Sequence, residues 1–188
     1  MGLLLKAQGK LAEAELFVRE AMEEFRRVLG DDHPDTLTSI SNMGHLLQAQ
    51  GKLTEAEPIV REALETSRRV LGDGHADTLN SINNMGDLLQ AEGKLNEAEP
   101  YWREALEKRR RVLGEEHPDT LISMNNMGVL LQAQGKLAEA EGYHREALEK
   151  RRRVLGNEHP NTLTSVNNMA NLLQAQGKLA EAEGYCRE

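Results

Sequence analysis

The sequence predicts an all-α protein built as a solenoid, in which antiparallel helical hairpins stack one on the next. A string close to N-N-M-G-V-L-L-Q-A-Q-G-K-L-A-E-A-E recurs along the chain. The glycine of its G-K-L segment returns every 42 residues, at Gly9, Gly51, Gly93, Gly135 and Gly177. A fixed period of this size is typical of stacked repeats, each of which contacts mainly its neighbours. Glu, Lys, Arg, Ala, Leu and Gln dominate the composition, and these residues favour helix.

The first half of each repeat is expected to be one helix, as the segment after Asp31 illustrates. Pro34 suits a first helical position, where its missing N–H needs no partner, and Asp35 in the first turn is favourable against the helix dipole. Apolar or small residues then follow at three- and four-residue steps, the spacing of one helix face: Leu37, Ile40, Met43, Gly44 and Leu47. We expect Gly51 to end this helix in the left-handed conformation.

The second half is expected to be a second helix that packs back on the first. Its apolar stripe comprises Leu53, Ala56, Val60, Ala63, Leu64 and Leu71, and Gly72 is expected to stop it. Thr54 and Glu57 have the spacing of a capping box at its start. Gly44 and Ala56 are small where the two helices approach closely.

The domain organisation predicted from the period is one repeat array. It consists of a partial first repeat (1–30), complete repeats at 31–72, 73–114 and 115–156, and a truncated last repeat (157–188). A single hairpin cannot bury both of its faces, so stacking is required for stability. Neither end shows a polar capping helix, so we expect a segment of a longer array. Copies are expected to associate head to tail through their uncapped ends.

The composition argues against several functions. The 188-residue chain carries a net charge of −8, which disfavours nucleic acid as the main ligand, because affinity for phosphate backbones comes from Lys and Arg. The sequence holds neither a signal peptide nor an apolar run long enough to cross a membrane. Cys186 is the one cysteine, which excludes an internal disulfide and favours a cytoplasmic protein over a secreted one.

No residues assemble a catalytic or metal site. His33, His75, His117 and His159 occur once per repeat, so they spread along the stack instead of surrounding one ion. Hydrogen bonding at the helix start is the expected role of these histidines. Cys186 occupies the repeat position held elsewhere by a valine, a tryptophan or a histidine, which indicates packing and not nucleophilic catalysis. We therefore expect no enzyme activity, no metal and no cofactor.

Two basic runs, 108–111 and 150–153, end the second helices of their repeats. Cations are favourable at a helix C-terminus. Glu104 and Glu107 precede Lys108 and Arg111 by four residues and are expected to pair with them. The interleaved aromatic residues of a single-strand RNA surface are missing.

The repeats resemble those of the tetratricopeptide repeat family. The resemblance rests on the spacing of Ile40, Met43, Gly44, Leu47, Ala56, Val60 and Ala63, and it recurs in every unit. The 42-residue form with L-G-x-x-H-P-D-T-L and N-N-M-G is similar to the repeats of kinesin light chains and their relatives. The coiled coil that joins kinesin light chains to the motor is absent, so kinesin function is not implied. The resemblance implies a right-handed superhelix whose first helices line a concave groove.

By this resemblance the Asn pairs in the first helices face the groove. Their amides could bind the backbone of an extended peptide, or could only tie one helix to its neighbour, and both alternatives stay open. The positions that vary most between repeats also fall on this face, which suits a surface tuned to a ligand or drift at exposed sites. The candidate groove residues are Thr38, Ser41, Asn42, His45, Asn80, Asn83, Asn84, Asp87, Ile122, Asn125, Asn126, Val129, Thr164, Asn167, Asn168 and Asn171.

The function predicted from these features is a non-enzymatic scaffold that binds a peptide or a partner segment in the groove. The alternative is a structural array that self-associates end to end or forms part of a larger protein. The family's clamp for acidic C-termini needs Lys or Arg in the groove, and none of the candidate positions carries one. An acidic chaperone C-terminus is therefore a disfavoured ligand.

Overall fold

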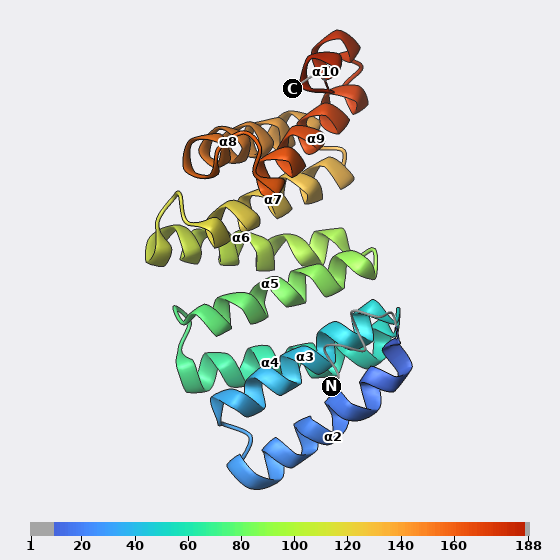
Figure 1. The fold of residues 1–188 in the computed structure, drawn as a ribbon, viewed down its shortest axis with the longest axis vertical. Coiled ribbons are helices and arrows are strands. Elements are labelled where there is room, and N and C mark those ends of the chain that lie inside the picture. The colour runs from blue at the N-terminus through green and yellow to red at the C-terminus, as the bar shows by residue number, and fades with distance from the viewer. Residues whose placement is uncertain (1–9, 187–188) are drawn as a thin grey trace. The chain divides into compact units, whose positions relative to one another are not determined.

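The computed structural model describes residues 10–186 and confirms the all-α prediction (Figure 1). Within this range it contains helices and connecting turns but no strand. The helices are α2 (Leu11–Leu29), α3 (Pro34–Ala49), α4 (Leu53–Leu71), α5 (Ala76–Ala91), α6 (Leu95–Leu113), α7 (Pro118–Ala133), α8 (Leu137–Leu155), α9 (Pro160–Ala175) and α10 (Leu179–Cys186). Residues 1–9 and 187–188 of the two incomplete repeats, and the side chain of Cys186, lie outside the described part. None of the described helices is both long enough and apolar enough to cross a membrane.

The helices alternate in length and follow the 42-residue period of the sequence. The short helices α3, α5, α7 and α9 have 16 residues each, and the long helices α2, α4, α6 and α8 have 19. The chain divides into two compact units, 1–101 and 102–188. In the first unit α3 packs against both α2 and α4, and α5 packs against α4 and contacts α3. In the second unit α8 lies against α7 and α9, α10 lies against α9, and α7 contacts α9.

A histidine immediately precedes every short helix and caps its start, as the sequence predicted. The Nδ1 atoms of His33, His75, His117 and His159 each accept a hydrogen bond from the backbone N–H two residues further on, at 3.1–3.2 Å. The histidine backbone is extended, so its side chain can satisfy one of the N–H groups that a helix start leaves without an intrahelical partner.

The start of the long helix differs from the expected capping box. Helix α4 begins at Leu53, so Thr54 lies inside the helix, and Lys52 before it makes no capping bond with its side chain. The cause is the tight link to α3. Gly51 has φ 74°, and the Lys52 N–H donates to the Leu47 carbonyl at 2.9 Å, which closes the end of α3 one residue before α4 begins. The capping-box expectation for Thr54 and Glu57 was therefore wrong.

A recurring ion pair joins the start of a long helix to the long helix before it. The Lys52 Nζ lies 2.7 Å from a carboxylate oxygen of Glu15, and the Lys178 Nζ lies 3.0 Å from one of Glu141. Lys94 and Glu57 repeat the arrangement at 4.0 Å. Each pair spans the same number of residues along the chain, so the contact follows the repeat itself.

Small residues let the two helices of a hairpin touch. A Cβ added to Gly44 of α3 would lie 2.8 Å from Val60 Cγ2 on α4. A Cβ added to Gly128 of α7 would lie 2.6 Å from the His144 ring on α8, and His144 is fully buried. The expected close approach at Gly44 is therefore observed.

Candidate functional site

The candidate residues lie on the four short helices, α3 and α5 in the first unit and α7 and α9 in the second. The exposed ones are Thr38, Asn42, Asn80, Ile122, Thr164, Asn167 and Asn171. The half-buried ones are Ser41, His45, Asn84, Asp87, Asn125, Asn126, Val129 and Asn168. Asn83 alone among them is buried, at 9 % exposure. The opposite sides of these helices carry the buried apolar residues, such as Ile40 and Met127.

Charge is almost absent from these positions. Asp87 is the one carboxylate among the candidate residues, and none of them is Lys or Arg. The chain as a whole is 29 % charged. The candidate surface therefore offers amides, hydroxyls, one imidazole and a few apolar side chains, which suit a neutral ligand better than a strongly charged one.

In the first unit three candidate side chains line the same recess. Ser41 and His45 come from α3, Asn84 comes from α5, and Val60 and Ala63 of α4 also line it. These three candidates therefore lie close together on two neighbouring helices. No hydrogen bond joins Ser41 to Asn84 in the part of the chain that the structure describes.

In the second unit the corresponding side chains are bonded to each other. The Asn168 Nδ2 on α9 donates to the Asn125 Oδ1 on α7 at 2.7 Å. In the first unit, by contrast, the Asn83 Nδ2 donates to the Asp87 carboxylate at 2.9 Å within helix α5. The Asn125–Asn168 bond is the contact expected of a tie between helices.

The two threonines of the candidate surface are bonded to their own helices. The hydroxyl of Thr38 donates to the Pro34 carbonyl at 3.0 Å, and that of Thr164 donates to the Pro160 carbonyl at 2.9 Å. Such bonds occupy the hydroxyl hydrogen, so each threonine offers a ligand an acceptor and a methyl group.

Two buried arginines were missed by the sequence analysis. The Arg151 Nη1 donates to the Ser165 Oγ at 2.7 Å and to the Asn161 carbonyl at 2.9 Å. The Arg109 Nη1 donates to the Ser123 Oγ at 2.6 Å, and both arginines are 4 % exposed. Each arginine lies on the buried face of its helix and precedes its serine partner by the same number of residues. This shared spacing is the sequence signal that could have indicated their burial.

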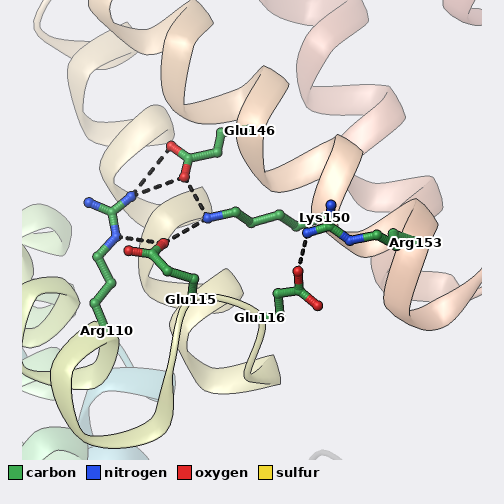
Figure 2. Close-up of polar contacts among 6 residues, drawn as sticks. All are labelled: Arg110, Glu115, Glu116, Glu146, Lys150 and Arg153. Carbon is green, nitrogen blue, oxygen red and sulfur yellow. Dashed lines mark hydrogen bonds and ion pairs between the residues drawn. The ribbon is translucent and has the colours of Figure 1, made fainter.

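Three further cations of the basic runs, Arg110, Lys150 and Arg153, are held by carboxylates of the same unit (Figure 2). The Lys150 Nζ lies 2.7 Å from Glu115 and 2.6 Å from Glu146. The Arg110 guanidinium contacts the same two carboxylates at 3.2 and 3.3 Å, and Arg153 pairs with Glu116. The hydrogen bond from Lys150 lowers the pKa of Glu115. These cations are therefore engaged in inter-helix contacts.

Of the two ion pairs expected near the end of α6, one is observed. The Lys108 Nζ lies 2.6 Å from Glu104, as predicted. Glu107 and Arg111 are both exposed and form no pair among the described residues. Two long exposed side chains gain little from a fixed pair, because holding them in one geometry costs entropy.

The stacked hairpins and the small residues at their contacts define a helical repeat protein of the solenoid class. The sequence profile described as "Tetratricopeptide repeat" matches residues 1–65, 38–98, 78–152 and 123–188. The chain belongs to the tetratricopeptide repeat family.

Solved structures support the same fold. A kinesin light chain-like protein of Podosopora anserina with nearly identical TPR-like repeats is 22 % identical, with a TM-score of 0.86, covering 99 % of this chain and 88 % of that one. BtubC (BKLC) from P. vanneervenii is 26 % identical, with a TM-score of 0.85 and coverages of 98 % and 73 %. A Rap protein complexed with Competence and Sporulation Factor is 15 % identical, with a TM-score of 0.79 and coverages of 98 % and 49 %. A comparison with curated protein sequences finds no match.

Proposed function

We propose that the chain is a non-enzymatic, cytoplasmic scaffold that binds an extended peptide or partner segment along the outward sides of its short helices. The observation that carries this proposal is the contrast within each short helix. One side is a buried apolar frame repeated in every unit, and the other is a mainly polar surface, with Asp87 as its one charged candidate residue, whose residues differ between repeats. Amide side chains on such a surface can bond to a peptide backbone of any sequence. The structural likeness to a Rap protein complexed with a factor is consistent with this use of the fold.

The test begins with a display library of extended peptides screened against the intact chain. A bound peptide is then titrated against the triple variant Asn84→Ala, Asn126→Ala and Asn168→Ala. We expect each lost hydrogen bond to weaken binding by about fivefold or more, since leaving a partner unsatisfied costs about 1 kcal/mol. Asn157→Ala, in the exposed turn before α9, is the matched control and should bind as the parent does. Unchanged affinity of a folded triple variant would contradict the assignment of the surface.

One observation favours end-to-end self-association as a second function. Leu37, Leu79 and Leu121 are 1–3 % exposed, and each lies in a helix that is followed by a further hairpin. Leu163 holds the same repeat position in α9 and is 45 % exposed. The face around Leu163 resembles one half of a repeat-to-repeat contact, and a second copy of this chain is the occupant that we propose for it.

Light scattering across a concentration series tests this second function. We expect the weight-average mass to rise with concentration, and Leu163→Glu to abolish the rise because it places a charge on the apolar face. Val112→Glu is the control and should leave the rise intact, because this repeat position is exposed in every unit and Val112 itself is 48 % exposed. A parent chain that stays monomeric at millimolar concentration would exclude self-association.

A further inference from the structure

We propose that Asp73 is a modification site, at which the chain converts spontaneously to isoaspartate through a succinimide formed with the backbone nitrogen of Gly74. The site lies in the turn between α4 and α5 (Figure 1). This inference goes beyond the proposed function and does not depend on it.

The reaction is a condensation within the chain followed by hydrolysis. The Gly74 nitrogen attacks Cγ of Asp73, and the new N–C bond closes a five-membered ring. One carboxyl oxygen leaves as water, with the amide proton and one further proton. Water then opens either ring carbonyl. Opening at the original peptide carbonyl leaves a backbone that runs through Cβ and Cγ and is one carbon longer, with the former peptide carbonyl as a free carboxylate. Nothing is oxidised or reduced, and the mass of the chain is unchanged.

The sequence places this chemistry at one position. Asp73–Gly74 is the one Asp-Gly pair in the chain, and no Asn-Gly pair occurs. The attack needs an unhindered nitrogen, and glycine has no Cβ to obstruct the approach. The turns after the other long helices place Asp32, Glu116 and Glu158 where Gly74 stands.

The fold does not require a glycine at this position. The three equivalent residues take the same kind of turn, and no described residue other than glycine has a positive φ. Gly72 has φ 81°, whereas the φ of Gly74 is not positive. Gly74 therefore differs from its counterparts in what it allows chemically and not in the backbone that it adopts.

The reacting groups are accessible and close to a cation. The Asp73 side chain is 61 % exposed, and the whole turn is exposed. The His75 N–H closes the turn on the Gly72 carbonyl at 3.3 Å, and the Gly74 N–H makes no hydrogen bond within the described residues. The Arg68 Nε lies 3.6 Å from the Asp73 Oδ1. Its charge can stabilise the oxyanion that forms when the nitrogen attacks.

The turn after α2 is a control within the same molecule. Asp31 is similarly exposed there and lies 3.8 Å from Arg26, the counterpart of Arg68. Asp32 follows Asp31 in place of a glycine. Its Cβ hinders the approach to its own nitrogen, and its negative charge opposes the loss of the amide proton.

Isomerisation should weaken the start of α5. The His75 Nδ1 caps this helix by accepting from the Asp77 N–H at 3.2 Å. One extra backbone carbon just before His75 shifts it relative to Gly72, which weakens the cap and the turn bond together. In thermal melts of aged protein, we expect the isomerised chains to melt below the unmodified ones. Identical melting of the two forms would refute this effect on α5.

The test ages the intact chain for several weeks at neutral pH and physiological temperature, and then digests it with trypsin. Peptides 28–52 and 70–94 carry Asp31 and Asp73 respectively. Electron-based fragmentation identifies isoaspartate by cleavage at its additional backbone carbon. We expect at least about tenfold more isoaspartate at Asp73 than at Asp31, because only Asp73 precedes an unhindered nitrogen. Absence of isoaspartate at Asp73, or equal amounts at both residues, would overturn the inference.

Two exchanged substitutions supply matched variants. Gly74→Asp copies the residue of the turn after α2 and should reduce isoaspartate at Asp73 to the level of Asp31. Asp32→Gly makes the reverse change and should raise isoaspartate at Asp31 to the level of Asp73. Both sequences already occur in this kind of turn, so both variants should fold. An unchanged yield in either variant would show that the residue after the aspartate does not determine the reaction.

Discussion

Side-chain packing at Gly128 is close, because a Cβ there would overlap the ring of His144. The nearest ring atoms would be 2.6–2.9 Å from that Cβ, closer than carbon atoms approach without repulsion. Val60 fills the equivalent place opposite Gly44. A glycine in the middle of a helix lowers helix stability, so its presence here follows from the helix contact.

We expect Gly128→Ala to destabilise the protein by about 1–3 kcal/mol, because α7 and α8 must separate or the His144 ring must move. Gly142→Ala in α8 is the matched control. A Cβ there meets nothing within 4 Å, and the change should stabilise by up to about 1 kcal/mol, since Ala is the better helix former. Chemical denaturation monitored by circular dichroism measures both. Equal effects of the two changes would show that the close contact does not control stability.

The asparagines of the short helices should separate into two classes on mutation. Asn168→Ala removes the bond to Asn125 and is expected to lower the free energy of unfolding by about 1 kcal/mol. Asn84→Ala removes no bond between α3 and α5 that the structure describes, so the gain in helix propensity should leave stability equal or slightly higher. Thermal melts of the two variants make the comparison. A loss as large in Asn84→Ala as in Asn168→Ala would mean that Asn84 is also a tie between helices.

At the scale of helices, the carboxylate and cation network of Figure 2 joins α8 to the end of α6 and the turn after it. Glu146 accepts from both Arg110 and Lys150, so its loss breaks two of these ion pairs at once. The groups are partly exposed, which limits what the pairs contribute in water.

We expect Glu146→Gln to lower stability by up to about 1 kcal/mol at low salt, and by less at 1 M salt, because ions screen exposed pairs. Glu149→Gln on the same helix is the control, since Glu149 is exposed and makes no ion pair within the described residues. Denaturation at two salt concentrations gives the result. An effect independent of salt would point to packing in place of charge.

The helices themselves could be predicted from the sequence, because the spacing of apolar residues, Pro34 and the histidines that cap the short helices are local signals. The capping box at Thr54 could not be judged locally, since the tight Gly51 turn lets α4 start at Leu53, two residues earlier than a cap at Thr54 would give. The burial of Arg109 and Arg151 was missed because arginine is rarely buried unless it is paired. Their hydrogen-bond acceptors lie on the next helix, and the sequence alone does not reveal that contact. Asn168 is bonded because Asn125 lies on the neighbouring helix, whereas Asn84 has Ser41 at the equivalent place. Only the fold brings these residues of different helices side by side. The groove assignment stays a prediction.

At the scale of the whole molecule, stability should fall with acidity in two ranges. Burial lowers the pKa of His144 to about 4, below the usual 6.5. The unfolded chain therefore binds a proton at His144 that the folded chain excludes, and stability decreases as the pH falls from about 6.5 to 4. Hydrogen bonds from Lys52 and Arg19 lower the pKa of Glu15 to about 2, and those from Gln176, Lys178 and Arg145 do the same for Glu141. Their contribution is present above about 4.5 and is lost towards pH 2.

We expect His144→Val to remove most of the loss between pH 6.5 and 4, because valine fills the same repeat position at Val60 without a titrating group. The difference between variant and parent should grow to about 3 kcal/mol at pH 4, as the pKa shift implies. The loss below pH 4.5 should persist in the variant. Denaturant titrations at several pH values give both slopes, and parallel pH profiles of parent and variant would contradict the assignment to His144.

The ion pairs that join successive long helices have a consequence for the gene. Lys52 meets Glu15 and Lys94 meets Glu57 across the same number of residues, so removing or copying one whole period lets each partner find an identical substitute. Excision of residues 73–114, for example, would bring Lys136 opposite Glu57. We expect a gene that has gained or lost one whole period to encode a foldable chain, so that array length can change independently of any amino-acid substitution.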